Sequence, residues 1–161
     1  MDCKNMGFAT RQIHAGKHDN GVGALCTPIF QTSTFEFESV QQGGARFAGQ
    51  EEGYIYSRLG NPSLTQVEEK LAALEGGEAA LATASGAAAI TYTIEALAQA
   101  GDHIVASSTI YGGTFNLISV TMKKMGIEAT FVDPLCTEEE LNAAFRPNTK
   151  VVFGETIANP A

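Results

Sequence analysis

The sequence has little of what several common classes of protein require. Its three cysteines, Cys3, Cys26 and Cys136, are widely separated, and none belongs to a Cys-x-x-Cys pair. A disulfide framework or a thiolate metal site is therefore not indicated, and a reducing cytoplasm is the expected location. The first residues contain no apolar run of signal-peptide length, and no segment approaches the length of a transmembrane span. We expect a soluble, intracellular protein.

Basic residues are also few. The 161 residues include 10 Lys and Arg against 18 Asp and Glu, a net charge of -8, which argues against nucleic acid as the main partner. A hydrophobic content of 44% is ordinary for a globular domain with a core. His14 and His18 have a spacing that suits a metal on a helix, but Gly16 lies between them. We interpret them as loop histidines and expect no bound metal.

Residues 1–60 lack a sustained hydrophobic period of either the helical or the strand type. Their aromatic residues are scattered: Phe8, Phe30, Phe35, Phe37, Phe47, Tyr54 and Tyr56. A segment of this kind buries little apolar surface by itself. We therefore expect an extended arm that buries its aromatic rings on another surface.

Residues 61–161 show a regular alternation of patterns. Asn61 and Pro62 predict the start of a helix that ends before Gly76 and Gly77. The strand candidates are residues 78–85, 103–107, 127–133 and 150–155, and the later helix candidates are 86–101, 112–126 and 137–145. This β-α-β-α-β-α-β order predicts an α/β fold with a mainly parallel sheet and helices on both faces.

Ligands of such sheets bind at the carboxyl ends of the strands, so residues 84–88, 107–114 and 156–161 are the loops of interest. In the first loop, Ser85 and the small residues after it either bind a phosphate at a helix start or allow tight packing. In the second, Tyr111 either stacks on a flat ligand or covers the sheet end. In the third, Glu155 and Asn159 either bind a polar ring or cap a turn.

The segment YIYSRLGNPS raises a further question, because Arg58 is either an ordinary surface charge or a ligand for an anion. YIYSRLGNPS, ASG, TIYGGTFN and VVFGETIANP occur in the same order as in the pyridoxal-phosphate enzymes of cysteine and methionine metabolism, which the chain resembles over its whole length. The resemblance implies pyridoxal 5'-phosphate as cofactor and the aspartate aminotransferase-like fold, fold type I. It implies that residues 1–60 contact a neighbouring subunit and that residues 61–161 begin the catalytic domain.

The resemblance also implies roles for residues of the first two loops. Ser85 and the backbone N–H groups of Gly86 and Ala87 would hold the cofactor phosphate. Tyr111 would stack on the pyridine ring and act catalytically, by passing a proton when the γ-substituent departs.

Four more site residues are implied in the same way. Asn159 would lie near the phenolic oxygen of the cofactor, and Glu155 would support the ring site. Tyr56, as a catalytic and cofactor-binding residue, and Arg58 would reach the phosphate of a neighbouring subunit in a homo-oligomer, expected to be a dimer of dimers.

Within the family, the motifs are most similar to those of O-acetylhomoserine sulfhydrylases, which replace the acetate of O-acetylhomoserine by sulfide or a thiol to give homocysteine. Methionine γ-lyases, the alternative, usually have a cysteine where this sequence has Gly113. Cystathionine γ-lyase or synthase activity is a further alternative, and a catalytically dead interaction module is the non-enzyme alternative.

The Schiff-base lysine of the family, and the aspartate that pairs with the pyridinium nitrogen, lie downstream of the motifs that match. None of the lysines in this chain has a matching context. We therefore interpret the 161 residues as a fragment that is inactive alone, and the activity above as that of a full-length enzyme.

Overall fold

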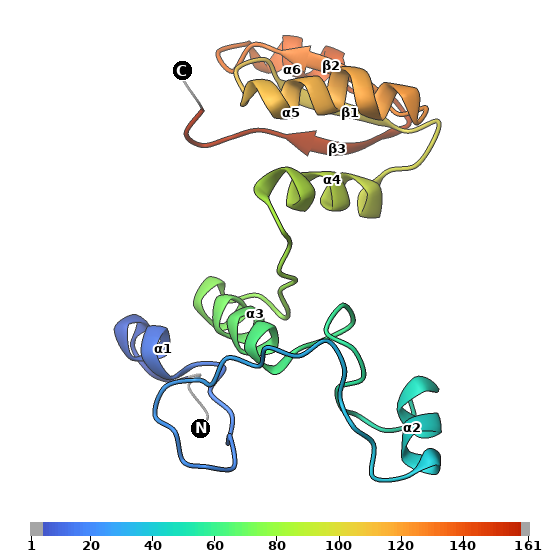
Figure 1. Ribbon diagram of the computed structural model, residues 1–161. Helices are drawn as coiled ribbons and strands as arrows, with labels where there is room; N and C mark the ends of the chain where they lie inside the picture. Colours follow the sequence, from blue (N-terminus) through green and yellow to red (C-terminus); the bar gives the residue numbers. More distant parts are fainter. Residues whose placement is uncertain (1–4, 159–161) are drawn as a thin grey trace. The chain divides into compact units, whose positions relative to one another are not determined.

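A computed structural model describes residues 5–158 of the chain. It contains two compact units, one up to Ala82 and one from Thr83 onward (Figure 1). Within the described range, no helix combines the length and the apolar character needed to cross a membrane. Each unit is described by itself below.

The first unit contains helices α1 (Phe8–His14), α2 (Val40–Phe47) and α3 (Pro62–Glu75). α3 begins and ends where the sequence predicts. The side chain of Asn61 accepts a hydrogen bond from the Ser63 N–H at 2.9 Å, and Gly76 ends the helix in the left-handed conformation, with φ 68°. Both signals are local, because a capping amide and a glycine that tolerates positive φ act within one turn.

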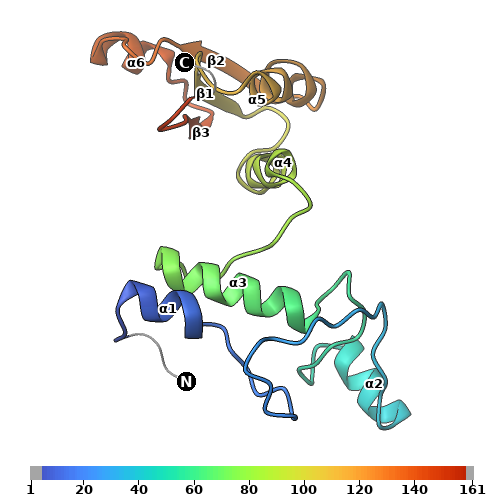
Figure 2. The same cartoon turned by 60° about the vertical axis from the view of Figure 1, so that its left-hand side comes forward.

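Helices α1 and α3 pack against each other (Figure 2). The Arg11 guanidinium donates to the Ala73 carbonyl oxygen at 2.8 Å, and Ala15 and Ala72 are buried. α1 and α2 form within residues 1–60, where the sequence shows no sustained hydrophobic period. They are 7 and 8 residues long, and two turns are too short for a hydrophobic period to stand out.

The second unit is built on three parallel strands, β1 (His103–Ser107), β2 (Glu128–Val132) and β3 (Thr149–Phe153), in the order β2-β1-β3. Its helices are α4 (Gly86–Leu97), α5 (Gly112–Asn116), the π-helix η1 (Leu117–Met122) and α6 (Glu138–Ala144). Thr137 and Glu140 form the predicted capping box at the start of α6. The α/β class with a parallel sheet is confirmed.

The central strand and the helices beside it form the core of this unit. The core consists of Ile94, Ala98, Ile104, Ala106, Ile110, Ile118, Met122, Ile127 and Val151. β1 is buried from His103 to Ala106, as expected for a strand with a neighbour on each side.

The strand expected at residues 78–85 is absent, which corrects that prediction. A strand exists only when a neighbour completes its backbone hydrogen bonds. No strand of the described range pairs with this segment, so its apolar composition alone does not produce one.

Candidate functional site

The start of α4 presents free hydrogen-bond donors. Ser85 is the N-cap, and its hydroxyl oxygen accepts from the Ala88 N–H at 3.1 Å, while its carbonyl oxygen accepts from the Ala89 N–H at 3.0 Å. Within the described part of the chain, the N–H groups of Gly86 and Ala87 have no partner. Both residues are exposed, so this end of a 12-residue helix can bind an anion.

Tyr111 lies at the start of α5, after the carboxyl end of β1. Its backbone N–H donates to a carboxylate oxygen of Glu155 at 3.1 Å, and Glu155 follows β3. Tyr111 as a whole residue is 52% exposed. The second and third loops of the sequence analysis therefore meet, and a phenol faces solvent at their junction.

A pocket of about 330 Å³ lies between the first turns of α4 and the α5–η1 helix. Its lining residues are Ala87, Ile90, Thr91, Tyr111, Gly113, Thr114, Asn116, Leu117 and Thr121. The structure thus brings Ala87 of the first loop and Tyr111 of the second together. All lining side chains are uncharged, and several carry hydroxyl or amide groups, so the pocket suits a neutral polar group.

The sequence analysis missed the polar residues of this pocket. Thr91 and Thr121 lie in segments that were predicted only to be helices, and Asn116 was not singled out. A signal was available, because threonine is unfavourable inside a helix and often marks a local hydrogen bond. The Thr91 hydroxyl donates to the Ala87 carbonyl oxygen at 2.8 Å.

Tyr56 and Arg58 belong to the first unit. The segment that carries them pairs with an earlier one: Tyr56 and Thr34 form an antiparallel bridge, and the Ser57 N–H donates to the Ser33 carbonyl oxygen at 2.8 Å. The Arg58 guanidinium lies 5.4 Å from the centre of the Tyr56 ring. It makes no ion pair or hydrogen bond with any described residue, which leaves its donors available to an external anion.

Asn61 holds this segment in place. It is 6% exposed, and its amide nitrogen donates to the Phe30 carbonyl oxygen at 3.0 Å and to the Ser57 hydroxyl at 2.9 Å. Because its oxygen also caps α3, Asn61 joins three segments of the first unit. Asn159, the remaining predicted site residue, lies outside the described residues.

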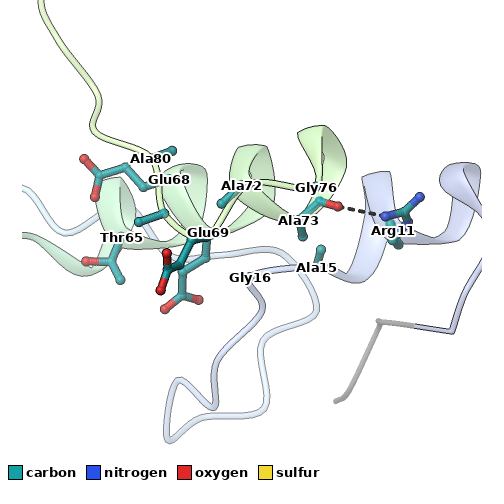
Figure 3. A pocket seen from close by; sticks show the side chains of 13 residues that line it. Arg11, Ala15, Gly16, Thr65, Glu68, Glu69, Ala72, Ala73, Gly76 and Ala80 are labelled. Atoms are coloured by element: carbon teal, nitrogen blue, oxygen red, sulfur yellow. Dashed lines mark hydrogen bonds between the residues drawn. The ribbon is translucent and has the colours of Figure 1, made fainter. Parts of the chain in front are cut away.

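A larger pocket of the first unit lies between α1 and α3, with a volume of about 640 Å³ (Figure 3). Small residues and three carboxylates, Glu68, Glu69 and Glu78, line it together with Arg11. It contains none of the predicted site residues, and its acidic lining disfavours a phosphate. Among the residues that the structure describes, no three His, Cys, Asp or Glu side chains gather in a metal-binding arrangement.

His103 is a buried titratable group at the opposite ends of the strands. Its ring nitrogens hydrogen-bond the Thr149 hydroxyl at 2.8 Å and the Thr130 hydroxyl at 2.9 Å. Burial lowers the pKa of His103, and the nearby Arg146 lowers it further, whereas Glu128 acts in the opposite direction. The histidine joins the three strands and does not reach the candidate site.

Comparison with known proteins agrees with this geometry. Residues 9–161 match the family described as Cys/Met metabolism PLP-dependent enzyme. The chain is 57% identical over 159 residues to an L-methionine gamma-lyase of Porphyromonas gingivalis, covering 99% of this chain and 40% of the relative. It is 47% identical over 155 residues to an O-acetyl-L-homoserine sulfhydrylase of Corynebacterium glutamicum, covering 96% and 36%.

A solved structure of a Campylobacter jejuni protein, described as an O-acetylhomoserine (thiol)-lyase, superimposes with a TM-score of 0.89 at 39% identity, covering 97% of this chain and 38% of that one. It contains a pyridoxyl-lysine phosphate group. The present chain thus spans about 40% of the length of its relatives. The free donors at α4 and the uncharged pocket beside Tyr111 fit such a cofactor. The chain belongs to the pyridoxal-phosphate-dependent enzymes of cysteine and methionine metabolism, with fold type I and pyridoxal phosphate as cofactor.

Proposed function

We propose that the whole protein replaces the acetate of O-acetylhomoserine by sulfide or a small thiol, giving homocysteine or a related thioether. The observation that carries this proposal is the uncharged pocket beside Tyr111, next to the free donors at the start of α4. An acetyl ester group and a neutral thiol are both small and polar without a full charge, which suits an uncharged lining.

The residues at the start of α4 bind the cofactor in this proposal. The N–H groups of Gly86 and Ala87 and the hydroxyl of Ser85 hold its phosphate, with the helix dipole favouring the negative charge. Bound pyridoxal phosphate supplies an electron sink for the carbon that carries the amino group. Together, the α4 donors would hold the phosphate end of the cofactor at the start of the helix.

Tyr111 is the second element of the proposed site, beside the residues at the start of α4. Its ring would stack on the ring of the cofactor, and its hydroxyl would hold a proton for the departing acetate. Glu155 keeps the backbone of Tyr111 in place through the 3.1 Å hydrogen bond. Asn159 is proposed to bind the phenolic oxygen of the cofactor.

Tyr56 and Arg58 complete the phosphate site of a neighbouring subunit in the proposed homo-oligomer. The free guanidinium of Arg58, beside the ring of Tyr56, supports this role. Residues 1–60 are the proposed arm that makes the contact, and residues 61–161 the start of the catalytic domain.

Gly113 favours the sulfhydrylase over methionine γ-lyase, because the lyases usually carry a cysteine there. The 57% identity to a named γ-lyase supports the lyase as second candidate. Steady-state assays of the whole protein with O-acetylhomoserine plus sulfide, and with methionine alone, separate the two. Faster homocysteine formation is expected, whereas faster release of 2-oxobutyrate from methionine assigns the lyase. An interaction module would turn over neither substrate.

A further inference from the structure

The phenol ring of Tyr111 lies directly against Gly113. A Cβ atom at Gly113 would be 2.4 Å from Cε1, 3.0 Å from Cζ and 3.2 Å from Cδ1 of that ring. Carbon atoms that are not bonded do not approach to 2.4 Å, so the ring occupies this position only because residue 113 has no side chain. At the preceding Gly112, a Cβ would meet nothing within 4 Å.

Neither backbone conformation nor helix formation accounts for the glycine. The backbone φ angle of Gly113 is not positive, so the backbone conformation there suits any residue. It lies within α5, where glycine is a poorer helix former than alanine. The contact with the ring is the remaining structural reason for a glycine at this position.

We infer that Gly113 is a positioning residue for Tyr111, which seats the phenol ring against α5 and thereby sets one wall of the uncharged pocket. Tyr111 and Gly113 both line that pocket. The Tyr111 backbone is held by Glu155, and the residue is 52% exposed. A side chain at position 113 therefore turns the ring about its side-chain torsions and leaves the backbone in place.

The ring position can be measured without any cofactor. We suggest placing 3-fluorotyrosine at position 111 of the whole, cofactor-free protein and recording its fluorine NMR spectrum. Gly113→Ala is expected to shift the resonance, whereas the matched change Gly112→Ala, one residue away in the same helix, leaves it unchanged. Equal shifts in the two variants, or no shift in Gly113→Ala, would overturn the inference.

A double variant keeps the inference testable if Gly113→Ala fails to fold. If Gly113→Ala does not fold, the double variant Tyr111→Leu/Gly113→Ala is expected to fold, because the obstructed ring is gone. A double variant that remains unfolded would show that the ring is not what residue 113 accommodates, and the inference would be wrong.

The importance of the ring position for turnover rests on the proposed function and is tested separately. In the cofactor-loaded enzyme, Gly113→Ala is expected to lower kcat and to shift its pH profile, while Gly112→Ala leaves both unchanged. If the fluorine resonance moves but the kinetics of the two variants are alike, the positioning role stands and the proposed role of Tyr111 fails.

Discussion

The carboxylate of Glu155 accepts a hydrogen bond from the backbone N–H of Tyr111 at 3.1 Å. The two residues are 44 positions apart, and they follow β3 and β1, which are neighbours in the sheet. A side-chain oxygen of Glu155 thus accepts from the N–H that precedes α5. The contact fixes the relative position of two loops of the candidate site.

Changing Glu155 should loosen this junction. We expect Glu155→Ala to lower the free energy of unfolding by about 1 kcal/mol, the usual worth of one hydrogen bond. Glu155→Gln keeps an acceptor oxygen and should lose less. Denaturant unfolding of the three proteins measures both effects, and equal losses in Ala and Gln variants would mean that the charge, not the hydrogen bond, matters.

The proposed phosphate role of Arg58 predicts a loss of cofactor affinity when the guanidinium is removed. Arg58→Ala should weaken retention of pyridoxal phosphate by roughly 2 kcal/mol, within the range for hydrogen bonds to charged groups. Arg58→Lys keeps the charge but not the two-pronged geometry, so its loss should be intermediate. Fluorescence titration of the cofactor-free whole protein gives the dissociation constants. Unchanged affinity in Arg58→Ala would contradict the role.

The proposed contact across subunits has its own test. Arg58→Ala subunits are mixed with subunits whose Schiff-base lysine is replaced. If Arg58 serves a neighbouring site, a mixed dimer contains one complete site and recovers part of the activity. Mixed oligomers that assemble but remain inactive would show that Arg58 serves its own chain or no phosphate.

Asn61 should be hard to replace even by its closest analogue. Asn61→Asp keeps the oxygen that caps α3 but loses both N–H donors, so we expect a loss of about 1–3 kcal/mol in the free energy of unfolding. Asn20→Asp is the control, because Asn20 makes a single donor bond, to the Ala24 carbonyl oxygen. Chemical denaturation compares the two. A smaller loss for Asn61→Asp than for Asn20→Asp would refute the bridging role.

His103 should make stability depend on pH. Its folded pKa lies below the ordinary value of 6.5, so the unfolded chain binds the proton first as the pH falls. The contribution of His103 is therefore complete above pH 6.5 and is lost as the pH falls toward the folded pKa. As the pH is lowered through this range, the free energy of unfolding should decrease more steeply in the wild type than in His103→Gln. The same slope in wild type and His103→Gln would show that another group titrates.

Short-range signals made part of this fold predictable. Asn61, Pro62 and Gly76 define the ends of α3 through contacts within one helical turn. The apolar run of β1 reflects its burial, whereas β2 and β3 are only partly buried. The loops after β1 and β3 were identified from strand order alone. The prediction of a strand at residues 78–85 was wrong because a strand also needs a partner, which the composition of the segment does not provide.

Contacts between distant residues were not predictable in this way. The hydroxyls that bind His103 are 27 and 46 positions away, so their pairing depends on strand register. The pocket residues Thr91 and Thr121 meet only after α4 and η1 have packed. The contact of Tyr111 with Gly113 is close in sequence, yet it depends on a side-chain torsion that no periodicity reveals.

The parallel sheet places the buried histidine and the candidate site at opposite ends of its strands. His103 begins β1, whereas Tyr111 and Glu155 follow the other ends of the strands. A five-residue strand spans roughly 15 Å, beyond the about 7–10 Å over which substitutions usually influence one another. Mutational effects at the two ends should therefore add, which leaves the loops at the carboxyl ends free to diversify during evolution without readjustment of the histidine end.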